Sequence, residues 1–203
     1  MPLIAESGVA GPLRWTWRPH AHGSAAEPGV RAWLAGLLET AANALPILRD
    51  QHGRPRLGAP FANHDLGWSH SGEGLLMAFG AGVTDTPIEL GVDLERLRPR
   101  PRAQDLARRF FTPAEADWLQ VLPADTRDLA FTRLWCAKEA VLKAHGRGLA
   151  FGLHRLAFGE RNGMLVLVDC DAALGAATDW TVHELVPHPG YRAVLAWRTR
   201  PCR

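Results

Sequence analysis

The amino-acid sequence predicts an α+β fold in which helices and antiparallel hairpins come in blocks. The chain has 203 residues, of which 47% are hydrophobic, and this is enough for one large domain or two small ones. Candidate helices gather after residue 100, and two hairpin patterns follow around Asn162-Gly163 and Pro187–Gly190. Because strands and helices do not alternate strictly, we expect two sheets and not a parallel β-α-β architecture.

Each element is predicted from its local pattern of apolar residues and breakers. In the first half, the sequence predicts a strand at Leu13–Arg18, a helix at Val30–Ala44 closed by Pro46, and two neighbouring buried strands at Leu75–Phe79 and Ile88–Leu94. In the second half, it predicts helices at Asp105–Phe111, Pro113–Val121 and Thr126–His145, the last ended by Gly146 and Gly148. The hairpins pair His154–Phe158 with Met164–Asp169, and Trp180–Val186 with Tyr191–Arg198.

The composition argues against a membrane protein, a disulfide-rich protein and a nucleic-acid-binding protein. The start has no basic segment followed by a long apolar run, and nowhere do eighteen apolar residues follow one another, so we expect a cytoplasmic protein without a membrane partner. Cys136, Cys170 and Cys202 are far apart and odd in number, which indicates neither a disulfide framework nor a cysteine zinc site. The formal net charge of +2 is too small to indicate a nucleic-acid partner.

Positive charge is nevertheless concentrated locally. One segment contains six arginines and a single acidic residue, Asp105: Arg96, Arg98, Arg100, Arg102, Arg108 and Arg109. From composition alone, this segment is either a solvated loop that runs into a helix or a surface for an acidic partner.

The chain contains only two lysines, Lys138 and Lys143, and both lie beside Glu139 in the expected long helix. A compact ammonium differs from a guanidinium, so two lysines in an arginine-rich chain suggest a site that handles phosphate or protons. Lys138 falls inside the apolar stripe of that helix, whereas Glu139 and Lys143 share its edge. The alternative is an ordinary i,i+4 surface pair, with Lys138 reaching out to water.

Two carboxylates share one face of the expected strand Ile88–Leu94. The two-residue period of Gly91-Val-Asp-Leu-Glu95 places Asp93 and Glu95 together while Val92 and Leu94 face the core. Paired carboxylate oxygens suit Mg²⁺, particularly if substrate phosphates supply the remaining ligands. Two solvated acids at a strand end would have the same spacing.

Ser69-His70-Ser71 lies between a loop and a strand, where two hydroxyls and an imidazole could donate hydrogen bonds to phosphate oxygens. A serine hydrolase is not expected, because neighbours on an extended strand point to opposite faces and no G-x-S-x-G motif is present. Phosphate binding and a purely structural loop remain as interpretations.

In their order along the chain, Ser69–Ser71, Gly91–Glu95 and Trp135–Lys143 resemble the motifs of the 4′-phosphopantetheinyl transferases of the Sfp type. The resemblance extends through Gly53-Arg54-Pro55, Arg109–Glu115 and Pro189-Gly-Tyr191, and covers about three quarters of the chain. The chain departs from the family at Leu66-Gly67, where Phe-Asn is usual. Arg31 is the only match to an early basic helix position.

The resemblance implies that phosphopantetheine moves from coenzyme A onto a serine of an acyl or peptidyl carrier protein, with release of adenosine 3′,5′-bisphosphate. It implies Asp93, Glu95 and Glu139 as Mg²⁺ ligands, Glu139 also as the base, and Lys143 with Lys138 as stabilisers of the leaving bisphosphate. Arg54, Ser69, His70, Lys143 and Arg31 would bind coenzyme A. The role of Glu115 stays open between base, ligand and support.

The family's fold implies two similar α+β halves, residues 1–90 and 91–203, with coenzyme A in the cleft between them. Acidic carrier proteins favour the arginine segment as a docking surface, and a monomer is expected because both halves lie in one chain. Two other functions remain: a Mg²⁺-dependent hydrolase of nucleotide pyrophosphates, and a non-catalytic module that binds coenzyme A or a carrier protein.

Overall fold

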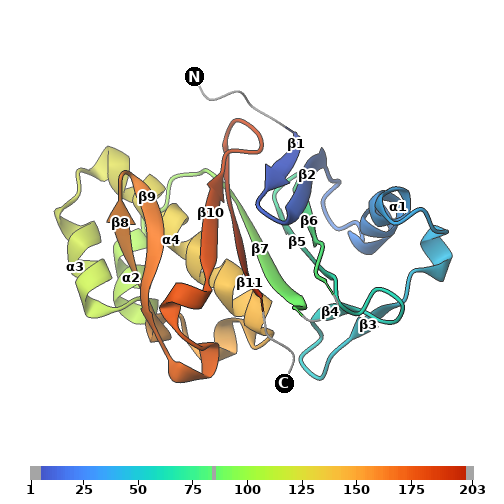
Figure 1. The fold of residues 1–203 in the computed structure, drawn as a ribbon. Coiled ribbons are helices and arrows are strands. Elements are labelled where there is room, and N and C mark those ends of the chain that lie inside the picture. The colour runs from blue at the N-terminus through green and yellow to red at the C-terminus, as the bar shows by residue number, and fades with distance from the viewer. Residues whose placement is uncertain (1–5, 84–85, 200–203) are drawn as a thin grey trace.

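The computed structural model describes residues 6–83 and 86–199 (Figure 1). Its strands are β1 (Ser7–Ala10), β2 (Leu13–Pro19), β3 (Ile47–Arg49), β4 (Pro55–Leu57), β5 (Asp65–Ser71), β6 (Gly74–Gly80), β7 (Ile88–Arg96), β8 (Leu156–Arg161), β9 (Met164–Cys170), β10 (Thr181–Leu185) and β11 (Tyr191–Thr199). Its α-helices are α1 (Glu27–Leu37), α2 (Ala103–Phe110), α3 (Pro113–Val121) and α4 (Ala124–His145). The prediction of an α+β fold is therefore confirmed.

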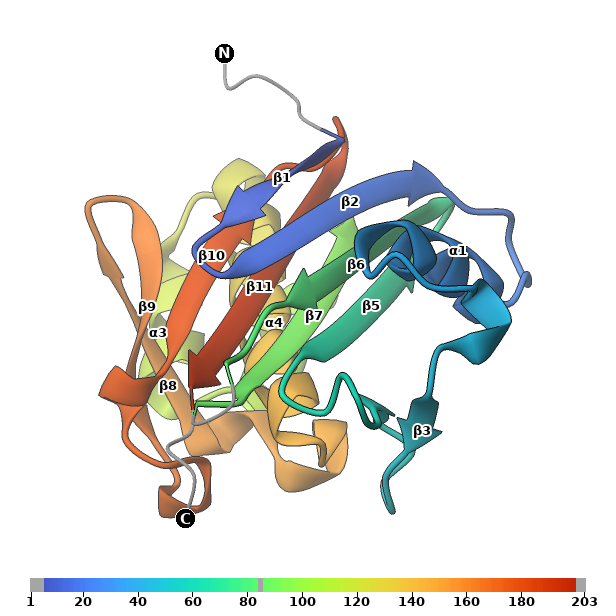
Figure 2. The same ribbon diagram turned by 45° about the vertical axis from the view of Figure 1, so that its right-hand side comes forward.

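Two larger antiparallel sheets face each other in the middle of the molecule (Figure 2). The first has the strand order β1-β2-β6-β5, the second has the order β10-β11-β7, and β3-β4 and β8-β9 are separate two-stranded ribbons. The strands at Leu75–Phe79 and Ile88–Leu94, predicted as neighbours, do not pair with each other. Instead, β6 pairs with β2 and β5, whereas β7 pairs with β11. Periodicity identifies a strand but does not identify its partner.

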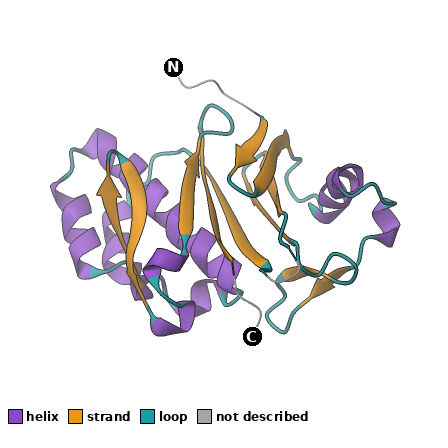
Figure 3. Ribbon diagram, viewed as in Figure 1, coloured by secondary structure: helices purple, strands orange, loops and turns teal. Residues whose placement is uncertain are grey.

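The helices are divided unequally between the two sheets (Figure 3). Helix α1 packs on the outer face of the first sheet around buried Val30 and Leu34. Helices α2, α3 and α4 lie beyond the second sheet, where α4 is at the centre of the largest hydrophobic cluster. A further cluster fills the space between the sheets and includes Leu90, Val92 and Leu94 of β7. One face of β7 is therefore core, as its pattern predicts.

Turn and helix boundaries agree with the sequence in most places. Asn162 and Gly163 have φ of 51° and 77° and close the β8-β9 hairpin, and Gly146 ends α4 with φ of 96°. The helix expected at Val30–Ala44 is wrong in its extent, because Glu39 takes a φ of 48° after α1 and only a short 3₁₀ turn follows at Ala42–Ala44. The strand expected from His154 begins at Leu156, after a 3₁₀ turn.

The remaining composition-based expectations concern cysteines and membranes. Cys136 and Cys170 are free thiols, and Cys202 lies outside the described residues. Within the described part of the chain, no helix is long and apolar enough to cross a membrane.

Candidate functional site

The candidate site lies where β5 and β7, which belong to different sheets, run side by side. Two serine hydroxyls of β5 reach carboxylates of β7: the Ser69 Oγ donates to Asp93 Oδ1 at 3.1 Å, and the Ser71 Oγ to Glu95 Oε2 at 3.4 Å. The two-residue period of each strand aims these four side chains at one another. Two separate sequence motifs therefore meet in one place.

Helix α4 approaches the same face of β7 unusually closely because residue 91 is glycine. A Cβ atom at this position would overlap with the carbonyl oxygen of Ala140 and would lie 2.5 Å from the amide nitrogen of Ala144. The absent side chain lets the helix backbone pack against the strand backbone. This contact positions Glu139 and Lys143 beside Asp93.

Lys143 forms the centre of a polar group where α4 meets β5 and β7. Its Nζ lies 2.6 Å from Asp93 Oδ1 and donates to Ser69 Oγ at 3.0 Å. Burial disfavours the charged form of Lys143, but the neighbouring Asp93 and Glu139 carboxylates raise its pKa overall. The other oxygen of Asp93, Oδ2, is buried and has no hydrogen-bond partner in the described structure. The Lys143 ammonium thus contacts only one of the two oxygens of the Asp93 carboxylate.

Glu139 is the most perturbed carboxylate of the group. Only 6% of the residue is exposed, and within the described residues no hydrogen bond or ion pair holds its carboxylate. Burial and the negative charges of Asp93 and Glu95 raise its pKa to about 7, against the opposing effect of Lys143. Glu95 has a raised pKa for the same two reasons, burial and Asp93, although it forms a 2.6 Å ion pair with Arg100. The cluster carries more negative charge than its own cations neutralise.

The excess of negative charge in the cluster indicates whether its residues suit a divalent cation. Burial and the charge of Asp93 raise the pKa of both Glu95 and Glu139, and one buried oxygen of Asp93 lacks a partner. In the part of the chain that the structure describes, no three His, Cys, Asp or Glu side chains are already arranged as a metal-binding group. The donor set fits Mg²⁺ in chemistry and charge, and binding would require side chains to reorient.

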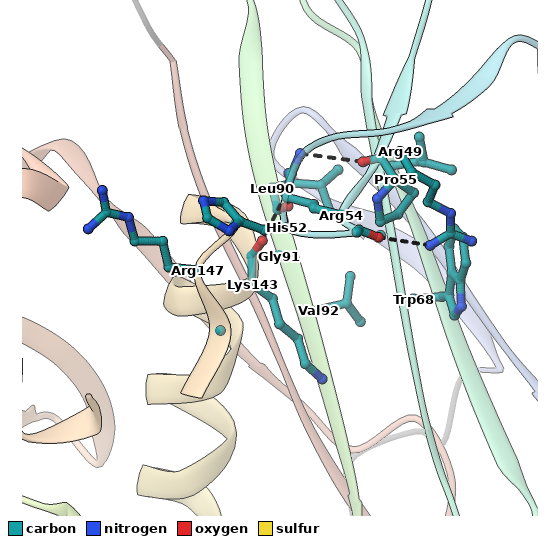
Figure 4. A pocket seen from close by; sticks show the side chains of 15 residues that line it. Arg49, His52, Arg54, Pro55, Trp68, Leu90, Gly91, Val92, Lys143 and Arg147 are labelled. Carbon is teal, nitrogen blue, oxygen red and sulfur yellow. Dashed lines mark hydrogen bonds between the residues drawn. The ribbon is translucent and has the colours of Figure 1, made fainter. Parts of the chain in front are cut away.

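A pocket of about 320 Å³ opens beside the polar group, at the C-terminal end of α4 (Figure 4). We call it the cationic pocket, because its basic and imidazole side chains come from both halves of the chain: Arg49, His52, Arg54, Lys143 and Arg147. No Asp or Glu is among the described residues that line it. Trp68 forms one wall, under the guanidinium of Arg49 at 5.2 Å from the ring centroid. An anionic ligand with a flat ring suits this lining.

Lys138 does not join the site, and its predicted catalytic role is corrected. Its side chain is fully buried on another side of α4, 2.8 Å from Glu115 and hydrogen-bonded to the Leu153 and Leu156 carbonyls. Successive helix residues differ by about 100° in direction, so Lys138 cannot accompany its neighbour Glu139. Burial lowers the pKa of Lys138, with Glu115 opposing this effect. Nor does the ammonium reach water, which was the other interpretation.

Glu115, whose role the motifs left open, is a structural residue. Its carboxylate completes a capping box with Thr112 at the start of α3 and accepts a hydrogen bond from the Phe158 amide at 2.9 Å. Together with Lys138, it ties α3, α4 and β8 into one unit, at a distance from the carboxylate cluster.

The arginines predicted to bind coenzyme A are occupied by other contacts. Arg31 pairs with Glu27 and donates to the carbonyls of Ala42 and Leu45, outside the cationic pocket. Arg54 lines that pocket, but its guanidinium is buried, 2.5 Å from Asp65. Arg54 also donates to the Leu90 and Lys143 carbonyls, so it holds the two halves together. Arg54 is therefore a buried structural contact, and Arg31 lies away from the cationic pocket.

The motif Ser69–Ser71 is divided by the strand on which it lies. Ser69 belongs to the polar group, whereas His70 is exposed on the opposite face and contacts His20 edge-on, with ring centroids 5.6 Å apart. Gly67, where the family usually has Asn, packs tightly: a Cβ there would meet Leu90 and Val92 side chains at 3.1 Å. The departure at this position therefore coincides with a close contact between β5 and β7.

Sequence reasoning missed four residues that the fold brings to the site: Arg49, His52, Trp68 and Arg147. They line the cationic pocket from three different segments. Only Arg147 carried a signal, because it directly follows the helix-ending Gly146, near Lys143.

Comparisons with known proteins relate the chain to one family. A model of the 4′-phosphopantetheinyl transferase superfamily matches residues 89–196. The chain is 33% identical to the 4′-phosphopantetheinyl transferase HetI of Nostoc sp. over 82% of its own length and 66% of that protein's. It is 33% identical to the 4′-phosphopantetheinyl transferase psf-1 of Bacillus pumilus over 58% of its length and 42% of that protein's. The solved structure of Thermotoga maritima holo-[acyl-carrier-protein] synthase matches 54% of this chain and 62% of its own, with 21% identity and a TM-score of 0.42.

Proposed function

Because the chain belongs to the 4′-phosphopantetheinyl transferase superfamily, we propose that it transfers 4′-phosphopantetheine from coenzyme A to a serine of an acyl or peptidyl carrier protein. The observation that supports the proposal is that the cationic pocket and the carboxylate cluster lie next to each other. The cationic pocket, which no described acidic side chain lines, adjoins a buried cluster of three carboxylates and one lysine. Such a junction suits an anionic nucleotide whose reacting phosphate meets a cation and a base.

Coenzyme A binds with its nucleotide end in the cationic pocket. Arg49, which also pairs with Glu27 at 2.6 Å, and Arg147 provide positive charge for its phosphates. His52 provides an imidazole, and Trp68 provides an aromatic wall. Arg54 keeps this pocket in shape by joining Asp65 to the backbone of β7 and α4. The pyrophosphate then reaches Lys143, which lines the pocket and also contacts Asp93.

Asp93, Glu95 and Glu139 would hold Mg²⁺, which when bound neutralises negative charge on the pyrophosphate. Lys143 holds one Asp93 oxygen, and the other is buried without a partner among the described residues. The residues of the cluster therefore bind, orient and balance charge around the reacting phosphate.

Glu139 acts as the base. Its raised pKa of about 7 and its lack of a described hydrogen-bond partner leave its carboxylate able to accept a proton. The carrier serine gives its proton to Glu139, and the serine oxygen bonds to the phosphorus that carries pantetheine. The bond from that phosphorus to the bridging oxygen breaks, and adenosine 3′,5′-bisphosphate leaves with the electron pair. Lys143 stabilises the charge on the leaving group.

The proposal includes a carrier-protein surface. Within the arginine-rich segment Arg96–Arg109, the arginine side chains other than Arg100 are exposed, and the segment follows directly from Glu95 at the end of β7. An acidic carrier protein docks here and brings its serine to the carboxylate cluster. We further propose a cytoplasmic monomer in which residues 1–90 and 91–203 form the two halves of the site, without a nucleic-acid or membrane partner.

Intact-mass analysis of an apo carrier protein tests the proposal. Incubated with coenzyme A, Mg²⁺ and this protein, the carrier gains the mass of one phosphopantetheine. The gain disappears with a chelator or with Glu139→Gln, and it persists with Glu73→Gln, a matched change of an exposed glutamate in the β5-β6 turn.

Two outcomes would contradict the proposal. Release of adenosine 3′,5′-bisphosphate without any carrier modification would identify a hydrolase. Coenzyme A binding without release or transfer, across several apo carrier proteins, would identify a binding module.

A further inference from the structure

One arginine of the arginine-rich segment points into the protein. The side chain of Arg100 is 13% exposed, and its Nη2 lies 2.6 Å from Glu95 Oε2, whose own side chain is 19% exposed. The other arginines of the segment are exposed. Arg100 therefore differs from its neighbours in having a carboxylate of the cluster as its partner.

Packing fixes Arg100 in this position. Its backbone amide donates to Asp128 Oδ2 at 2.9 Å, near the start of α4, and its guanidinium carbon lies 5.7 Å from the Phe131 ring centroid. The Nε atom is buried and has no hydrogen-bond partner in the described structure. The ion pair with Glu95 is thus the polar contact that the buried guanidinium makes.

This contact affects what Glu95 can bind. The Oε2 atom of Glu95 accepts hydrogen bonds from both Arg100 and Ser71, so this oxygen is occupied on two sides. A divalent cation at the same carboxylate would face the positive charge of Arg100 at short range. The described carboxylates do not form a ready metal-binding group, although Asp93 Oδ2 lacks a partner.

We propose that Arg100 is a positioning residue that holds Glu95 in an internal ion pair and thereby competes with a divalent cation for the carboxylate cluster. The inference rests on the metal site of the proposed function. A cation that binds without substrate must either use the other oxygen of Glu95 against the charge of Arg100 or displace Arg100 from Oε2. Cation binding is accordingly weak in the free protein. The affinity for the cation rises when phosphate oxygens of a substrate supply additional ligands.

The competition is tested by whether the affinity for a divalent cation rises or falls when Arg100 is replaced. Mn²⁺ serves as the probe, because carboxylate sites accept it and its free concentration can be measured by electron paramagnetic resonance. At constant pH and without nucleotide, Arg100→Gln should bind Mn²⁺ about tenfold more tightly than the wild type, since the competing charge is gone. Arg100→Met, which keeps an apolar chain against Phe131, should do the same if Arg100→Gln does not fold.

Two control variants separate competition from net charge. Arg100→Lys keeps a positive charge near Glu95 and should stay close to wild-type affinity. Arg161→Gln removes an exposed arginine at the end of β8 and should also leave Mn²⁺ affinity unchanged.

Each alternative result overturns a defined part of the argument. Unchanged or weaker Mn²⁺ binding by both neutral Arg100 variants would overturn the competition and leave the metal site standing. Absence of Mn²⁺ binding by the wild type and by both neutral variants would overturn the metal site itself, and this inference with it. Equal tightening in Arg161→Gln would show a net-charge effect and would also overturn the inference.

Discussion

Replacing Glu139 by glutamine should stabilise the metal-free protein at alkaline pH, even though the change removes the proposed base. Glu139 is 6% exposed and lies among the negative charges of Asp93 and Glu95. Its folded-state pKa is about 7, above its ordinary value of 4.5. A raised carboxyl pKa means that the folded state prefers the protonated side chain, which glutamine imitates in shape and neutrality.

The sign and size follow from proton linkage. The stability that protonated Glu139 supplies is present below pH 4.5 and is lost as the pH rises through about 7. At 1.36 kcal/mol for each pH unit between the two pKa values, the full loss is about 3 kcal/mol. Glu139→Gln should therefore exceed the wild type by about 3 kcal/mol at pH 8 and by about 1 kcal/mol at pH 5.

Urea unfolding at both pH values, with a chelator present, measures this difference directly. The control is Glu73→Gln, which changes an exposed glutamate and should shift the free energy of unfolding equally at both pH values. A stability difference between Glu139→Gln and the wild type that stays the same from pH 5 to pH 8 would refute the description of Glu139 as a charge buried against its neighbours. Loss of stability at pH 8 would refute it more strongly.

Three further predictions concern packing and the pocket. Lys138→Met should cost about 4 kcal/mol in unfolding experiments because it leaves the Glu115 carboxylate buried without its counter-ion. Adding Glu115→Gln should restore part of that loss, since glutamine removes the charge but keeps only one of the two oxygens that accept from Thr112 and Phe158; failure of the second change to help would contradict the pairing. Arg147→Gln should weaken coenzyme A binding, measured by calorimetry, about tenfold, whereas Arg31→Gln should leave it unchanged. Weaker binding by Arg31→Gln alone would instead assign the phosphate contact to Arg31 of α1. Gly91→Ala should force α4 away from β7 at a cost of about 3 kcal/mol, and wild-type thermal stability would disprove the close contact.

The local geometry of the site could be predicted from the sequence because it depends on the periods of single elements. Asp93 and Glu95 share a face of β7 and Val92 faces the core, as a two-residue period requires. Glu139 and Lys143 lie together because they are four residues apart on one helix. The breakers at Gly146 and Asn162-Gly163 end and turn the chain where their backbone angles allow it.

Ionic partners could not be predicted, because they depend on which elements pack together. Lys138 and Glu139 are adjacent in sequence, yet one pairs with Glu115 of α3 and the other faces Asp93 of β7. Arg54 matches a family motif, but Asp65 and two backbone carbonyls occupy its guanidinium. A motif identifies a side chain without identifying its nearest opposite charge.

By itself, the sequence determined the α+β class, the helix and strand that carry the catalytic candidates, and the face on which each carboxylate lies. Those properties arise from backbone periodicity and from the φ values that single residues tolerate. Only the tertiary structure decided which carboxylate each arginine meets, that Arg147 and Arg49 line one pocket, and that Arg100 holds Glu95. The reason is physical: charge interactions act through space between segments far apart in the chain, and burial sets their strength.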